Sequence, residues 1–451
     1  MDGAPPTAVA YCLFAPMNSF QTIVLVIFAI FATVGTIVFS GFFSSREEGA
    51  ESAQLILWGT LPSRQLDIFL AEFNKEKLVP PIRYVEFTAD NFDQALVEAL
   101  AESRGPDLIL LPHDLLLRHQ AKIAPVLYSS LPQRTFEDSF IDQAKIFSGV
   151  DGILGFPLFV DPIVLYWNKD LFTNAELLQS PSSWEQVMGV IRRLTKVDGA
   201  GNIIQSAIGL GTFQNVAHAK DILSLLLLQS GEEIVYRDSQ NRKFSGILGV
   251  RRDGNQSGAE ASLRFFTEFS NPTKPDTYTW NSALRLSRTM FTDGDLAMYL
   301  GPWSEHRLIL ERNPHLNFDV AVVPQRENGL TRTTYGKLFV VAPLKSSPNN
   351  AVAISASATL AKAPYASKLS EIAGLPPARR DLLENGTDDP DQVIAYRSAI
   401  LSRGWLDPEP SKTNLLFRGA VEAITSGSSR ESGAATQLAS QLQDLLPEEA
   451  L

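Results

Sequence analysis

Three short apolar runs separated by two amphipathic segments open the folded part of the chain. The runs at residues 54–58, 82–87 and 107–111 have the length and composition of strands. The first segment between them carries leucine and phenylalanine at i, i+3, i+4 and i+7 from Leu66, the stripe of an amphipathic helix. In the second segment, Asn91 is predicted to cap a helix. This β-α-β-α-β order predicts parallel strands with right-handed crossovers, and therefore an α/β domain.

Polar and aromatic side chains follow the first and third of these predicted strands. Trp58 and Thr60 come at the end of the first, and Asp114 comes just after the third. In open α/β sheets, ligands bind beyond the carboxyl ends of the strands. These positions are therefore candidates for a ligand site, although Trp58 could instead belong to the core and Asp114 could be a helix cap.

The middle of the chain continues the alternation of strands and helices. In residues 155–172, two apolar stretches flank Asp161 and its following proline and predict strands, and Asn168 is predicted to begin a turn. Ser182 and Ser183 start a helix with two overlapping capping boxes. A run of apolar residues at 219–229 predicts a buried helix, and the polar stretch that follows predicts a surface hairpin or loop at 237–257.

A strand is also predicted at residues 296–300, where it ends at Gly301 and Pro302. These two residues restrict the backbone, so we expect the indole of Trp303 to be held at the end of the strand. The C-terminal third of the chain is predicted to be mostly helical.

The N-terminus contains a long apolar run at residues 22–43, and no charge lies between Asp2 and Arg46. As a helix, the run would span roughly 33 Å, enough to cross a bilayer core. A cleaved signal peptide is the alternative, but its apolar region would be about 7–15 residues and would end at an A-x-A-like site. We therefore predict an uncleaved transmembrane signal anchor at 22–43, preceded by a tail at 1–21 and followed by a tether at 44–53.

Composition narrows the classes of function. The chain has 451 residues, 45% of them hydrophobic and 20% charged, which is typical of a globular protein with two or three folding units. The net charge of −11 speaks against binding to nucleic acid, for which a basic surface is expected. The single cysteine, Cys12, excludes a disulfide framework, and the five histidines never fall at HxxxH or HExxH spacing. We therefore expect neither a metal nor a cofactor.

Six motifs occur in an order that resembles one known family. They are LILWGT at 55–60, PDLILLPHDLL at 106–116, GFPLFVDPIVLYWNKDLF at 155–172, PSSWE at 181–185, GDLAMYLGPW at 294–303 and LPPAR at 375–379. Together they resemble the family-1 extracellular solute-binding proteins, the maltose-binding-protein-like components of ABC importers. The resemblance covers about residues 54–446.

The resemblance implies a two-lobed α/β fold of the periplasmic-binding-protein type, with a hinge and a cleft between the lobes. The polypeptide would cross between lobes near 159–163 and 337–342. One lobe would combine about 54–158 with a stretch after residue 342, and the other would combine about 164–336 with the C-terminal helices. Together they would form a solute-binding domain spanning residues 54–451.

The same resemblance suggests roles for individual residues. Asp114 and Asp161 match acidic positions that bind sugar hydroxyls, and a carboxylate can accept from two neighbouring hydroxyl groups. Trp58 and Thr60 match the loop after the first strand. For Asp161, a purely structural turn at the hinge is the alternative.

Two tryptophans are candidate platforms for a sugar ring. Trp303 matches the family's aromatic floor, and in that role part of its ring should be exposed in the open cleft. Trp405, which precedes Asp407, is a second candidate. A position in the core is the alternative for both.

The resemblance implies a binding protein and not an enzyme. The domain would lie on the extracytoplasmic side of the cell membrane, held there by its N-terminal helix. It would capture a small solute, foremost a mono- or oligosaccharide, and deliver it to the permease subunits of an ABC importer. Three alternatives remain: a non-sugar ligand such as a polyamine or glycerol phosphate, a sensor that docks a signalling receptor, and a glycoside hydrolase using Asp114 and Asp161 as its two carboxylates.

Overall fold

The computed structural model describes residues 54–238, 243–246, 248, 257–327, 329 and 331–447. The chain divides into two compact units, Met1–Gln54 and Leu55–Leu451, and the fold below is that of the second. The predicted tail, anchor and tether lie outside the described residues. Within the described ranges, no helix is both long enough and apolar enough to cross a membrane.

The N-terminal part of this unit is a parallel β-α-β-α-β arrangement. Strands β1 (Leu55–Gly59), β2 (Ile82–Glu86) and β3 (Leu108–Pro112) are joined by helices α2 (Ser63–Phe73) and α3 (Ala89–Ala101). β1 lies between the other two strands and is parallel to both. The predicted order of elements is confirmed.

The two helices differ in how well their details were predicted. The apolar stripe of α2 that begins at Leu66 is buried against the sheet, as expected. The predicted cap at Asn91 is wrong, because α3 begins at Ala89 and the Asn91 N–H already donates to the Thr88 carbonyl. The side chain of Thr88, in the capping position, makes no capping hydrogen bond.

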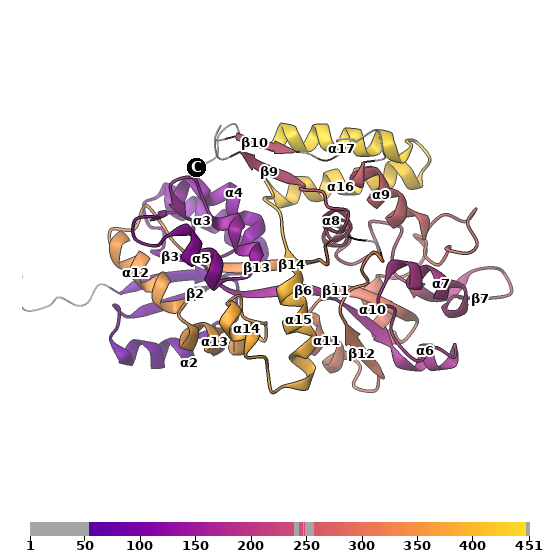
Figure 1. The fold of residues 1–451 in the computed structure, drawn as a ribbon, viewed down its shortest axis with the longest axis horizontal. Helices are drawn as coiled ribbons and strands as arrows, with labels where there is room; N and C mark the ends of the chain where they lie inside the picture. Colours follow the sequence, from indigo (N-terminus) through magenta and orange to yellow (C-terminus); the bar gives the residue numbers. More distant parts are fainter. Residues whose placement is uncertain are drawn as a thin grey trace, which may run out of the picture. The chain divides into compact units, whose positions relative to one another are not determined.

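One continuous sheet runs through the unit in the order β2-β1-β3-β13-β6-β11-β8-β7, with β12 on β6 and β14 on β13. The bounds of its other strands are β6 Phe156–Asn168, β7 Lys196–Val197, β8 Ile203–Ile208, β11 Leu296–Pro302, β12 Phe318–Ala321, β13 Thr334–Pro343 and β14 Ser402–Arg403. Two of these strands, β6 and β13, are the longest and lie in the middle of the sheet (Figure 1).

Strand β6 joins the two halves of the sheet. Its first half pairs with β13, and its second half, from Ile163 on, pairs with β11 and β12. The change of partners occurs at Asp161 and Pro162. The predicted pair of strands is therefore one 13-residue strand. The predicted turn at Asn168 is a helix start, because its side chain accepts a hydrogen bond of 3.0 Å from the Leu171 N–H and caps α6 (Lys169–Asn174).

Helices cover both ends of the sheet (Figure 1). α12 (Asn350–Leu360) packs on β13, and α13 (Ala363–Ala373) packs on α2 and β6. At the other end, α16 (Pro410–Thr425) and α17 (Glu431–Leu445) pack on each other and on α9 (Gly258–Glu268). The C-terminal part of the sequence thus contributes helices to both halves.

Two further predictions are confirmed in the second half. Ser183 caps α7 (Trp184–Leu194), with its hydroxyl accepting from the Gln186 N–H. α8 (Ala219–Gln229) is almost entirely buried. The polar stretch after it includes an antiparallel hairpin of β9 (Val235–Asp238) and β10 (Lys243–Gly246).

The remaining elements are short. They are α4 Leu116–His119, β4 Val126–Leu127, α5 Gln133–Ser139, β5 Gly152–Ile153, α10 Ser287–Asp293, α11 Glu305–Arg312, α14 Arg380–Glu384 and α15 Val393–Leu401.

Candidate ligand-binding site at the hinge strands

Three charged side chains from three segments gather where β6 changes partners. Asp114 lies in the turn after β3, and Lys337 lies on β13 directly opposite Asp161 of β6. Residues paired across an antiparallel ladder place their side chains on the same face of the sheet. The Lys337 ammonium is 3.1 Å from Asp114 Oδ2, and the two side chains are 39% and 14% exposed. The structure thus brings together two of the predicted site residues with a lysine that the sequence interpretation missed.

The Asp114–Lys337 pair is charged and incompletely satisfied. Burial alone would raise the pKa of Asp114, but the Lys337 ammonium, with smaller contributions from His113 and Lys220, holds it below its usual value. In turn Asp114, and to a smaller extent Asp221, raises the pKa of Lys337. Asp114 Oδ1 is buried and has no hydrogen-bond partner among the described residues. A buried acceptor without a donor is costly, so this carboxylate is incompletely satisfied in the folded protein.

Asp161 is bound to the segment that follows β11. Its Oδ1 accepts a hydrogen bond of 2.9 Å from the Ser304 N–H. Burial raises the pKa of Asp161 to about 6, and the Ser304 hydrogen bond only partly offsets that rise. Ionisation of this carboxylate at neutral pH therefore lowers the stability of the folded protein.

This loss of stability predicts that Asp161→Asn is more stable than the wild type at neutral pH. Between about pH 4 and pH 6, the unfolded polypeptide has lost the Asp161 proton while the folded protein still holds it, so stability falls as the pH rises through this window. The asparagine does not titrate and its side-chain oxygen can still accept from Ser304. At pH 7 we expect the variant to be more stable by about 1–3 kcal/mol. Urea unfolding from pH 4 to pH 7 measures the difference, and a gap between variant and wild type that does not change with pH would contradict it.

A second polar cluster lies just after Trp303 in the sequence. Glu305 is 4% exposed, and its carboxylate accepts from His218 Nε2 at 3.0 Å, from the Arg288 guanidinium at 2.7 Å and from the Tyr299 hydroxyl. Burial alone would raise the pKa of Glu305, but these donors, His218 first, hold it below its usual value. Nothing in the sequence motifs pointed to this cluster. Lys337, in contrast, could have been found as the one charge inside the apolar run of β13.

The two predicted platforms are both buried. Trp303 is 5% exposed, stacks on His306 with ring centroids 4.6 Å apart, and donates its indole N–H to the Gly374 carbonyl at 3.0 Å. The expectation of a partly open Trp303 ring is therefore not met. Trp405 is 3% exposed and donates to the Ser224 hydroxyl at 3.1 Å. The Lys220 ammonium lies 5.4 Å from the centroid of the Trp405 ring. Contact of either indole with a ligand stays a prediction.

Trp58 and Thr60 lie at the end of β1, two strands away from β13. Both side chains are half-buried, and the Trp58 ring packs against Phe87 with centroids 4.4 Å apart. Their contact with a ligand also stays a prediction.

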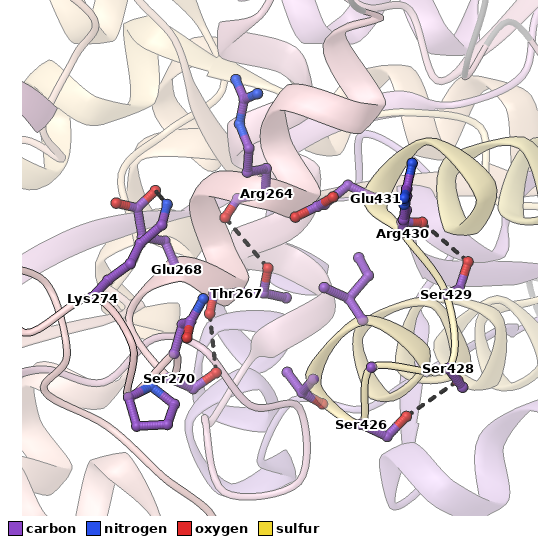
Figure 2. Close-up of a pocket in the computed structure, with 15 residues that line it drawn as sticks. Arg264, Thr267, Glu268, Ser270, Lys274, Ser426, Ser428, Ser429, Arg430 and Glu431 are labelled. Carbon is purple, nitrogen blue, oxygen red and sulfur yellow. Dashed lines mark hydrogen bonds and ion pairs between the residues drawn. The ribbon is translucent and has the colours of Figure 1, made fainter.

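A polar cavity of about 580 Å³ lies elsewhere, between α9 and the loop that joins α16 to α17 (Figure 2). Its hydroxyl groups are already engaged: Thr267 donates to the Leu263 carbonyl, and Ser429 donates to the Arg430 carbonyl. Across the described ranges, no group of three or more histidine, cysteine, aspartate or glutamate residues is suited to a metal ion. The region where β6 and β13 pair, at which the family resemblance puts the hinge, therefore stays the candidate ligand site; these two strands are called the hinge strands below.

The family profile described as bacterial extracellular solute-binding protein matches residues 63–365, which is more than half of the chain. The chain belongs to this family. The family resemblance of the motifs is confirmed, and the members of the family are binding proteins.

One curated relative is the galactooligosaccharide-binding protein of Bacillus subtilis (strain 168), 22% identical over 303 residues. The alignment spans 65% of this chain and 65% of the relative, slightly less than two thirds of the relative's length.

Solved structures share the fold of this solute-binding protein. The cyclic alpha-maltosyl-1,6-maltose binding protein from Arthrobacter globiformis has a TM-score of 0.70 at 14% identity, covering 87% of this chain and 98% of that one. An ABC transporter solute-binding protein from Thermotoga lettingae, bound with alpha-D-tagatose, has a TM-score of 0.62 at 17% identity, covering 87% of this chain and 99% of that one. The fold is therefore the two-domain α/β fold of periplasmic binding proteins.

Proposed function

We propose that this solute-binding protein captures a carbohydrate between its two lobes and delivers it to the permease of an ABC importer. The observation that carries the proposal is the Asp114–Lys337 pair, which lies at the hinge strands and leaves one carboxylate oxygen without a donor among the described residues. The names of the relatives support the choice of ligand, since they are described as binding galactooligosaccharide, a cyclic maltosyl-maltose and tagatose.

The chemistry of this pair suits a hydroxyl group better than a charged ligand. A hydroxyl both donates and accepts, so it can donate to the Asp114 carboxylate and accept from the Lys337 ammonium. A polyamine would meet the like charge of Lys337. Glycerol phosphate would meet the like charges of Asp114 and Asp161. A neutral polyol avoids both conflicts, and no catalytic step is needed for this role.

A thermal-shift screen tests the proposal. The purified domain is heated with galactooligosaccharide, maltotriose, tagatose, spermidine or glycerol 3-phosphate. A ligand that binds only the folded state stabilises it by RT ln(1 + [L]/Kd), about 2.7 kcal/mol at 100 times Kd. We expect a rise in melting temperature with at least one of the sugars. A shift confined to spermidine or glycerol 3-phosphate would contradict the proposal.

We also propose that residues 22–43 anchor the protein in the cell membrane, with the solute-binding domain on the extracytoplasmic side. The apolar run supports an anchor because of its length, and the family description, extracellular solute-binding protein, supports the location of the domain.

Removal of residues 1–45 tests the anchor. Because the long apolar run lies within the deleted segment, we expect the shortened protein to leave the membrane fraction and to unfold in one cooperative thermal transition. The full-length protein is the control and should sediment with membranes. A shortened protein that still sediments with membranes would rule out this anchor.

A further inference from the structure

His218 has an unusual backbone conformation at the start of α8. Its φ of 58° and ψ of 28° are left-handed, a region that residues other than glycine seldom adopt, with asparagine, aspartate and histidine the most frequent exceptions. Such strain costs free energy, persists only where surrounding contacts enforce it and is concentrated at functional sites. Here the contact is the 3.0 Å hydrogen bond from His218 Nε2 to the buried Glu305 carboxylate.

The other ring nitrogen of His218, Nδ1, has no comparably short contact with a carboxylate. An ionised carboxylate only accepts, so Nε2 carries a hydrogen toward Glu305. Nδ1 faces Asp221 Oδ2 at 3.8 Å, which is too long for a direct hydrogen bond. The His218 and Asp221 side chains are 28% and 27% exposed, so both can be reached from solvent. A hydroxyl oxygen lying beside these two atoms, about 2.8 Å from each, could accept from Nδ1 and donate to Asp221.

This gap is close to the charged groups at the hinge strands. α8 packs against β13, the strand that carries Lys337. The Asp221 carboxylate is close enough to the Lys337 ammonium to raise the pKa of Lys337. Ser304, which donates to Asp161, is the sequence neighbour of Glu305. His218 and Asp221 therefore lie at the start of α8, beside the hinge strands, whereas Asp114 lies in the turn after β3.

We propose that His218 and Asp221 form a second hydroxyl-binding pair, which holds the same ligand as the Asp114–Lys337 pair from the side of α8. The inference rests on the proposed function, because it assumes a polyol between the lobes. Burial alone would lower the pKa of His218, but Glu305 raises it above its usual value, which favours the doubly protonated ring that donates from both nitrogens.

The test compares binding by wild type, His218→Asn, His218→Gly and Asp221→Asn. Galactooligosaccharide and maltotriose are the probes, and calorimetry measures Kd. Asparagine and glycine both tolerate the left-handed backbone, so these variants remove the ring without adding strain. We expect Kd to rise at least tenfold in each variant. Glu176→Gly is the matched control, because Glu176 also has a left-handed φ, of 56°, and lies just after the end of α6, so Kd should not change.

A second measurement uses the wild-type protein and follows His218 itself. The protein has five histidines, so the proton signals of their imidazole rings can be resolved by NMR, and the signal missing in His218→Asn identifies His218. We expect this signal to move when the sugar is added to the wild-type protein. A role limited to bracing Glu305 would leave it in place.

The outcomes separate this pair from the proposed function. If the wild type binds a sugar and all three variants bind it with a Kd within twofold of the wild type, the His218–Asp221 proposal is wrong. The same holds if the bound sugar does not move the His218 signal. Neither result would contradict the proposed function. A wild-type protein that binds neither sugar would overturn the proposed function and the pair with it.

Discussion

Trp303→Ala is expected to lower the free energy of unfolding by about 3–5 kcal/mol, the usual cost of removing a large buried aromatic side chain. The ring is 5% exposed and stacks on His306, and its N–H holds the Gly374 carbonyl, so the truncation leaves a cavity and an unpaired acceptor. Urea unfolding measures the loss. Trp303→Phe is the matched variant: it keeps an aromatic ring and loses the hydrogen bond, and should cost less.

Ligand binding by Trp303→Ala shows whether the indole packs in the core or contacts the sugar. If the indole were the floor of the sugar site, Trp303→Ala would weaken binding by about 30-fold or more, since a buried aromatic anchor commonly contributes 2 kcal/mol or more. The burial of the ring favours the packing role. A variant with nearly unchanged stability and a 30-fold loss of affinity would contradict this expectation and support the interpretation drawn from the sequence.

Lys337→Met is expected to weaken sugar binding by about 10-fold or more, because a hydrogen bond to a charged group contributes about 1.5–3 kcal/mol. The variant loses a donor to the ligand and leaves the Asp114 carboxylate unpaired. Without Lys337, burial would dominate and the pKa of Asp114 would rise. Calorimetry at pH 7 measures the change in Kd.

Two further variants define this effect. Asp114→Asn combined with Lys337→Met should cost less than the sum of the single changes, because each single change already breaks the pair. Lys368→Met is the control: it breaks an exposed pair with Glu72, in which the side chains are 57% and 63% exposed. Such a pair contributes about 0–1 kcal/mol, and affinity should not change. Additive effects at Asp114 and Lys337 would mean that the two residues do not act together.

Much of the fold was predictable because the relevant patterns are local. The apolar stripe of α2 and the alternation of three strands with two helices each depend on residues close in sequence, and both were confirmed. The errors were local as well. Asn91 and Asn168 have the chemistry of a cap and of a turn, but the place where a helix begins depends on neighbours that compete for the same backbone groups.

The candidate site was only half predictable for a different reason. Asp114 follows a strand and Asp161 interrupts an apolar run, so each is conspicuous in the sequence. Lys337 meets Asp114 because β13 lies between β3 and β6, and this order of strands is not encoded in any local pattern. The buried indoles of Trp303 and Trp405 likewise find their hydrogen-bond partners far away in the sequence, at Gly374 and Ser224.

The sequence by itself therefore determined the order of the first five elements, the cap of α7 at Ser183, and the family. Only the tertiary structure decided which charges meet: Lys337 with Asp114, and His218 with Glu305. The physical reason is that periodicity specifies which face of an element is buried, whereas the partner of a polar side chain depends on the packing of elements far apart in the sequence.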